Sequence, residues 1–199
     1  MSEAGQGTGR SCGCLAIDCA TRRDFFTVLS VVGLGLAANP ALGQPASERP
    51  KEGDFLVSIE SAGSQALAPE AIPLGGPPVL AWPMEPAGNT VRNDSRLNKI
   101  LLLRLDPKTL VGVTGERAAE GVVAYSAICP HAGCEVNVWV ADQLVLECSC
   151  HYSHFNPREA AAVIDGPAPR ALAALPLKIV DGKLAVAKPF TSRVGIVPS

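Results

Sequence analysis

Two short segments decide how this chain folds: Cys129-Pro130-His131-Ala132-Gly133-Cys134 and Cys148-Ser149-Cys150-His151-Tyr152-Ser153. We call them the first and second box. Each box holds a cysteine and a histidine at close spacing, C-x-H in the first and C-x-x-H in the second, and each holds one further cysteine. Two thiolates and two imidazoles would form a closed tetrahedral zinc site. They would equally hold a two-iron, two-sulfur cluster, with both thiolates on one iron and both imidazoles on the other.

The further cysteines, Cys134 and Cys150, distinguish these alternatives, because a structural zinc site needs no additional cysteine in each ligand loop. The six-residue pattern, together with Gly133 and Ser153, resembles the Rieske iron–sulfur family. Within that family the chain is similar to the iron–sulfur subunit of quinol–cytochrome c reductases and to the small subunit of arsenite oxidases. The resemblance is firm from the boxes to about residue 169 and weak before residue 128.

The resemblance implies one [2Fe–2S] cluster, whose ligands would be Cys129, His131, Cys148 and His151. It also implies a disulfide between Cys134 and Cys150 that holds the two boxes together over the cluster. The family exposes the free edges of both imidazoles, which makes them the expected exit for an electron. No catalytic residue is expected, because the protein would transfer electrons without substrate chemistry of its own.

Four further residues are expected around the cluster: Gly133, Ser153, Phe155 and Pro167. The resemblance places the Ser153 hydroxyl where it donates to a bridging sulfide, which raises the reduction potential. Phe155 stands where the cytochrome bc subunits have a tyrosine, so one hydrogen bond to the Cys129 sulfur is missing. Tyr152 and Ala132 also depart from those subunits, which have Gly and a larger aliphatic residue there.

The beginning of the chain predicts export. Residues 21–26 read Thr-Arg-Arg-Asp-Phe-Phe, a twin-arginine signal followed by an uncharged run over 25–38. That run has the length of a signal-peptide core and is shorter than the roughly twenty residues of a membrane-spanning helix. We expect a periplasmic protein, either soluble after cleavage near Gly43 or anchored to the inner membrane by an uncleaved segment. A disulfide also requires an oxidising compartment.

The expected organisation is a signal over 1–43, a linker over 44–53 and a Rieske domain over 54–199. Cys12, Cys14 and Cys19 belong to the leader and receive no role. The domain is expected to be all-β, a Rieske-type antiparallel sandwich with a small cluster-binding subdomain at about 128–169. Short apolar or alternating runs predict its strands. These are 54–59, 77–83 at a sheet edge, 99–105, 121–128, 135–140, 143–147, 160–164, 176–180 and 183–187.

Composition limits the partners. The 199 residues carry a net charge of −2 and show no basic stripe, which argues against nucleic acid. The leading hypothesis is the iron–sulfur subunit of a respiratory complex such as a quinol–cytochrome c reductase, working with a cytochrome or a quinol-oxidising membrane subunit. The alternative is a relay subunit beside a catalytic large subunit, as in arsenite oxidases. A zinc-binding structural module is the rival without redox function, and His154 is expected to be a solvent-facing loop residue.

Overall fold

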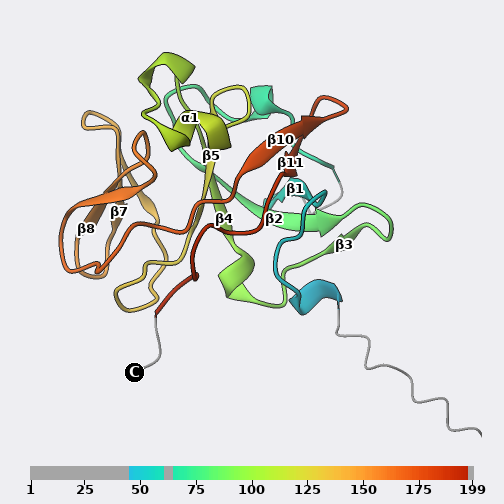
Figure 1. Ribbon diagram of the computed structural model, residues 1–199. Helices are drawn as coiled ribbons and strands as arrows, with labels where there is room; N and C mark the ends of the chain where they lie inside the picture. Colours follow the sequence, from blue (N-terminus) through green and yellow to red (C-terminus); the bar gives the residue numbers. More distant parts are fainter. Residues whose placement is uncertain (1–44, 61–64, 197–199) are drawn as a thin grey trace, which may run out of the picture. The chain divides into compact units, whose positions relative to one another are not determined.

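The computed structural model describes residues 45–60 and 65–196 (Figure 1). The expected signal over 1–43 and the three leader cysteines lie outside these residues. Everything described here belongs to one compact unit, residues 40–199. In the described part of the chain, no helix is long and apolar enough to cross a membrane.

The larger sheet has seven strands in the order β10-β11-β1-β2-β4-β5, with β3 beside β2, and its strand pairs are antiparallel. Its strands are β1 (Phe55–Ser58), β2 (Val79–Glu85), β3 (Thr90–Val91), β4 (Ile100–Arg104), β5 (Val122–Ser126), β10 (Leu177–Val180) and β11 (Lys183–Val186). The sheet curls until residues 173–175 reach β5, where the Leu175 N–H donates to the Ala124 carbonyl at 2.9 Å. This closure removes the exposed edge of β5.

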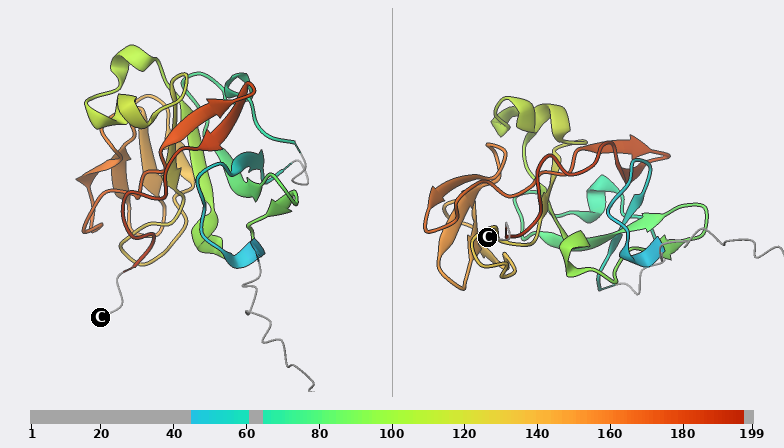
Figure 2. Two further views of the ribbon diagram at one scale, coloured as in Figure 1. Left: turned by 45° about the vertical axis from the view of Figure 1, so that its right-hand side comes forward. Right: turned by 60° about the horizontal axis from the view of Figure 1, so that its bottom comes forward.

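The smaller sheet holds β6 (Val138–Val140), β7 (Val145–Cys148), β8 (Ser153–Asn156) and β9 (Ala162–Asp165) in that order. It is drawn in yellow to orange beside the larger sheet (Figures 1 and 2). The remaining elements are short: α1 (Val113–Arg117), η1 (Pro45–Ser47), η2 (Pro69–Ala71), η3 (Arg96–Asn98) and η4 (Pro107–Thr109).

Strand β4 explains how the two sheets share a core. Ile100 and Leu102 face one hydrophobic cluster within the larger sheet, while Leu101 and Leu103 face a second cluster that includes residues of the boxes. Alternate side chains of a strand point to opposite faces, so a strand buried on both faces is apolar throughout. Cys129 and Cys148 both belong to the second cluster, which therefore anchors the boxes to the larger sheet.

The all-β, antiparallel prediction is confirmed. Asp181 and Gly182 form the expected tight turn between β10 and β11, with φ of 49° and 72°. The expected edge strand over 77–83 is wrong, because β2 lies between β1 and β4. Pro83 is tolerated there because β4 pairs only with residues 79–81. The Pro83 carbonyl instead accepts from the Arg92 N–H at 2.8 Å.

The expected linker, 44–53, is attached to the domain over its second half. Pro50 is buried, and Glu48 forms an ion pair of 2.7 Å with Arg92. Arg92 is only 2% exposed and also pairs with the buried Asp54 at 2.7 Å. Breaking such a buried pair would leave an uncompensated charge, which is costly. The ion pairs of Arg92 with Glu48 and Asp54 therefore hold the chain against the domain where it enters the first strand.

Candidate metal centre

The first box is a tight loop between β5 and β6. The Cys129 N–H donates to the Cys134 carbonyl at 2.8 Å, and the Gly133 N–H donates back to the Cys129 carbonyl at 3.0 Å. Gly133 has a φ of 74°, a left-handed conformation that glycine adopts without cost. The loop therefore turns sharply enough to bury Cys129, which is 1% exposed, while it leaves Ala132 in solvent.

The second box is the turn between β7 and β8. Cys148 ends one strand, Ser153 begins the next, and the two are paired across the sheet. The Tyr152 N–H donates to the Cys148 carbonyl at 2.9 Å and closes the turn. Cys148 is 2% exposed, whereas Cys150 and His151 at the tip are exposed. Each box thus carries a buried cysteine at its base and a histidine near its tip.

The structure brings the two boxes together. A disulfide joins Cys134 to Cys150, with a Cα–Cα distance of 6.5 Å. The rings of His131 and His151 meet edge to face, with centroids 4.6 Å apart. The Cys148 sulfur lies beside the disulfide, and these three sulfurs are all within 4.8 Å of one another. The pairing expected between Cys134 and Cys150 is therefore present, and it leaves two free thiols, Cys129 and Cys148, in the described chain.

The two free thiols lie close enough to affect each other. Burial raises the pKa of the Cys129 thiol, and the neighbouring Cys148 thiol raises it further. The backbone N–H groups of His131 and Ala132 face the Cys129 sulfur and lower the same pKa. Those two N–H groups favour a thiolate at this position. The donor set is thus two buried sulfurs at one end and two accessible imidazoles at the other, which fits a two-iron cluster better than one tetrahedral ion.

The residues expected around the cluster lie beside the boxes. Ser153 is 1% exposed, and its Oγ accepts from the Ala168 N–H at 3.1 Å. Phe155 is fully buried in the same cluster as Cys129 and Cys148 and has no hydroxyl to donate. Pro167 is exposed in the loop over 166–169. That loop lies tightly on the second box, since a Cβ on Gly166 would lie 2.5 Å from the Ser153 Cα.

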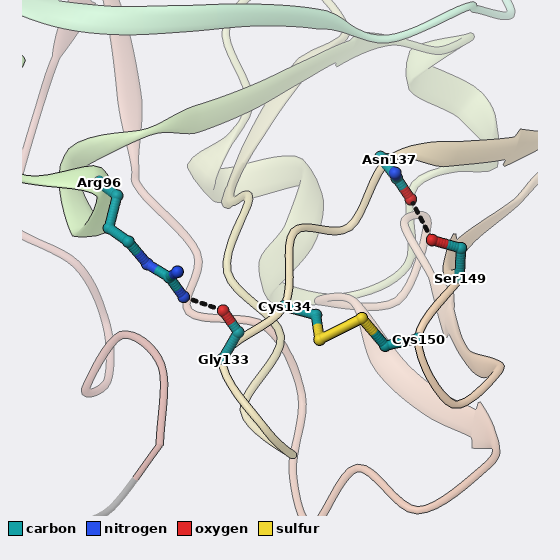
Figure 3. The surroundings of a disulfide bond; sticks show 6 residues. All are labelled: Arg96, Gly133, Cys134, Asn137, Ser149 and Cys150. Atoms are coloured by element: carbon teal, nitrogen blue, oxygen red, sulfur yellow. Dashed lines mark hydrogen bonds between the residues drawn. A yellow bond between two sulfur atoms is a disulfide. The ribbon is translucent and has the colours of Figure 1, made fainter.

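The boxes are also held by contacts that the sequence did not predict (Figure 3). Arg96 from η3 donates to the Gly133 carbonyl, and Ser149 donates to Asn137 at 3.0 Å. The Tyr125 hydroxyl, on the strand that leads into the first box, donates to the Pro157 carbonyl at 2.7 Å. No local motif signals such pairs, because their partners are 12 to 37 residues apart.

His154 corrects the sequence interpretation. It was expected in a solvent-facing loop, but it lies in β8 opposite Glu147, and its Nε2 is 2.7 Å from the Glu147 carboxylate. The strand was missed because its polar residues gave no apolar alternation. Ser153 and Phe155 face inward, while His154 points to the other face of the sheet and so lies away from the two thiols.

Comparison with known proteins identifies the arrangement. Residues 91–176 match the model of the Rieske [2Fe–2S] domain. A cytochrome bc1 complex Rieske iron–sulfur subunit from Streptomyces lividans is 30% identical over 148 residues, which span 72% of this chain and 85% of that protein. The chain belongs to the Rieske [2Fe–2S] family.

Two further relatives are named as subunits of respiratory complexes. A cytochrome bc1 complex Rieske subunit from Mycobacterium bovis is 32% identical over 145 residues, 65% of this chain and 34% of that protein. A putative respiratory nitrate reductase Rieske subunit from Haloferax mediterranei is 40% identical over 84 residues, 42% of this chain and 37% of that protein. The chain thus spans about a third of the length of these two relatives. Its cofactor is one [2Fe–2S] cluster, as in other Rieske domains.

Proposed function

We propose that this chain is a periplasmic electron-transfer protein, the iron–sulfur subunit of a respiratory complex such as a quinol–cytochrome c reductase. One observation carries the proposal: two buried thiols lie together while two imidazoles from different boxes meet near the surface. In this assignment Cys129 and Cys148 hold the inner iron, and His131 and His151 hold the outer iron. When bound, the cluster accepts and releases one electron.

The remaining residues determine how well that site works. The disulfide holds the two boxes at a fixed separation, and the hydrophobic cluster around Phe155 excludes water from the thiolate end. The Ser153 oxygen already accepts one hydrogen bond, which leaves its proton free to donate toward the cluster. The imidazoles supply the exposed edge through which a partner receives the electron. They also suit a quinol donor, which must release protons, because a ring nitrogen at this edge can accept one.

A set of histidine variants tests the ligand assignment. We expect His131→Ala and His151→Ala to lose the visible absorption and the electron paramagnetic resonance signal of a reduced [2Fe–2S] cluster. His154→Ala is the matched control and should keep both, because its ring pairs with Glu147 instead. A colourless wild-type protein with one zinc per chain would contradict the proposal and favour a structural module.

A second function has support from the nitrate reductase relative. The protein would then relay electrons from a catalytic large subunit to a cytochrome, which is also the role that the resemblance to arsenite oxidase small subunits implies. Purification of the tagged chain from detergent-solubilised membranes distinguishes the two. Co-purification of b-type haem together with quinol-dependent reduction supports the first function. A molybdopterin-containing large subunit in its place supports the relay.

The export route is a separate part of the proposal. The twin-arginine signal over 21–26 and the disulfide both support the periplasm. Fractionation of cells that express Arg22→Lys with Arg23→Lys tests it. The variant should accumulate in the cytoplasm, whereas the wild-type chain reaches the periplasm or the outer face of the inner membrane.

A further inference from the structure

Four arginines gather beside the first box. The C-terminal segment, residues 193–196, lies against this loop, since a Cβ on Gly133 would meet the Ile196 side chain at 3.9 Å and the Arg96 guanidinium at 3.2 Å. Arg170 donates to the Gly195 carbonyl of the same segment. Arg49 donates to the Leu97 carbonyl at 3.0 Å. We call Arg49, Arg96, Arg170 and Arg193 the arginine patch.

These arginines lack acidic partners. In residues 45–60 and 65–196, no carboxylate forms an ion pair with any of the four. Two nearby carboxylates are already neutralised, whereas a third, Asp94, lies two residues before Arg96 and forms no ion pair within residues 45–60 and 65–196. Glu48 pairs with Lys51 and Arg92, and Glu135 pairs with Lys99 at 2.8 Å. Four guanidiniums against the carboxylate of Asp94 leave net positive charge at one place in a protein whose net charge is −2.

The patch is also held in position. Three of its guanidiniums donate to backbone carbonyls, which leaves most of their N–H groups available to a partner. Arg49, Arg96 and Arg193 are exposed. Partial burial lowers the pKa of the Arg49 guanidinium, and the nearby charge of Arg193 lowers it further. The two guanidinium charges repel each other, and a carboxylate bound between them would relieve that repulsion.

We propose that the arginine patch is a docking surface for a redox partner protein whose own surface is rich in carboxylates. Arginine forms two parallel hydrogen bonds with a carboxylate, and guanidiniums that are already held lose less conformational freedom on binding. Arg96 holds the Gly133 carbonyl, two residues from His131, so a partner seated on the patch approaches an imidazole edge. The surface rests on the proposed electron-transfer function and adds the kind of partner to it.

The test uses two forms of one electron acceptor. Native cytochrome c is basic, and succinylated cytochrome c carries carboxylates in place of its lysine charges. The reduced holoprotein delivers one electron to the ferric haem, which becomes ferrous, and stopped-flow absorbance gives the second-order rate. We expect the succinylated form to react faster at low salt, and we expect its rate to fall as ionic strength rises.

Charge reversal locates the effect. Arg49→Glu with Arg193→Glu should slow the reaction with succinylated cytochrome c by tenfold or more and speed the reaction with the native form. The matched control is Arg104→Glu with Lys108→Glu, which makes the same charge change at the last residue of β4 and just beyond it, at the end of the strand opposite to Arg96. Equal rates for the two double variants would overturn the docking surface.

Two more outcomes separate the possibilities. If Arg49→Glu with Arg193→Glu instead abolishes binding to phosphatidylglycerol vesicles and leaves the cytochrome rates unchanged, the patch faces a membrane and the proposal is wrong. A wild-type protein that cannot be reversibly reduced would refute the electron-transfer function itself. A reversibly reduced protein with equal rates for both acceptor forms would refute the docking surface alone.

Discussion

The Ser153 hydroxyl oxygen accepts a hydrogen bond of 3.1 Å from the Ala168 N–H, so one buried side chain joins the second box to the loop over 166–169. Its proton remains free for the cluster. We expect Ser153→Ala to lower the reduction potential by roughly 40 mV, because a hydrogen bond of about 1 kcal/mol is lost and a one-electron couple shifts about 59 mV per tenfold change. Potentiometric titration measures this, and an unchanged potential would show that Ser153 does not donate to the cluster.

Phe155 offers the opposite substitution. We expect Phe155→Tyr to raise the potential by a few tens of millivolts. Phe155 belongs to the same hydrophobic cluster as Cys129, so the new hydroxyl can donate a hydrogen bond to the Cys129 sulfur. The control, Phe155→Leu, supplies no hydroxyl and should leave the potential near that of the wild type. We predict that the wild-type potential falls below that of Rieske proteins with both Ser and Tyr and above that of Rieske proteins without a disulfide. A titration placing it among the strongly negative ferredoxins would contradict this.

The disulfide should stabilise both the fold and the cluster. Cys134→Ser and Cys150→Ser each open a loop with a sequence separation of 16, which costs about 3 kcal/mol in the unfolding free energy. The cluster should still assemble, because the four proposed ligands remain, but with a lower potential. Urea denaturation and redox titration of both variants measure the two effects. A stable cluster with wild-type potential in both variants would refute a role for the bridge.

Gly166 tests how tightly the 166–169 loop lies on the second box. Its φ is 89°, and an added Cβ would lie 2.5 Å from the Ser153 Cα. We expect Gly166→Ala to cost clearly more than the about 1–2 kcal/mol of a left-handed alanine and to lower the potential as the loop lifts. Gly182→Ala is the matched control, with a φ of 72° and nothing within 4 Å. Equal losses in urea denaturation would mean that backbone conformation alone matters.

Tyr125 should give the protein a characteristic sensitivity to high pH. Burial raises the pKa of this phenol above its ordinary value of about 10. The unfolded chain therefore releases the proton first, so the stability linked to Tyr125 is complete below pH 10 and is lost as pH rises toward the folded-state pKa. Above pH 10 the unfolding free energy linked to Tyr125 falls by about 1.4 kcal/mol per pH unit. Tyr125→Phe should remove this contribution. Urea denaturation between pH 8 and 11.5 compares the two proteins.

The same variant has a cost at neutral pH. When the Tyr125 hydroxyl is removed, the Pro157 carbonyl loses the donor that lies 2.7 Å away. An unsatisfied buried acceptor costs about 1–3 kcal/mol of unfolding free energy. If Tyr125→Phe is as stable as the wild type at pH 7 and equally sensitive to high pH, both predictions are wrong.

Local sequence patterns were enough to predict the boxes, the turn at Asp181-Gly182 and every strand except β3 and β8. These features depend on residues within a few positions of one another: closely spaced cysteine and histidine, apolar alternation, and an Asp-Gly pair that accepts positive φ. The resemblance to Rieske proteins supplied the Cys134–Cys150 pairing, which the structure confirms.

The surroundings of the boxes follow from the tertiary fold. The strand expected at a sheet edge lies at β2 in the interior, because β1 and β4 pair with it from distant parts of the chain. His154 lies in a strand because Glu147 and the rest of β7 form its partner. Arg96 reaches Gly133 across 37 residues. Such contacts depend on how the sheets close on each other, and a local sequence pattern does not encode that closure.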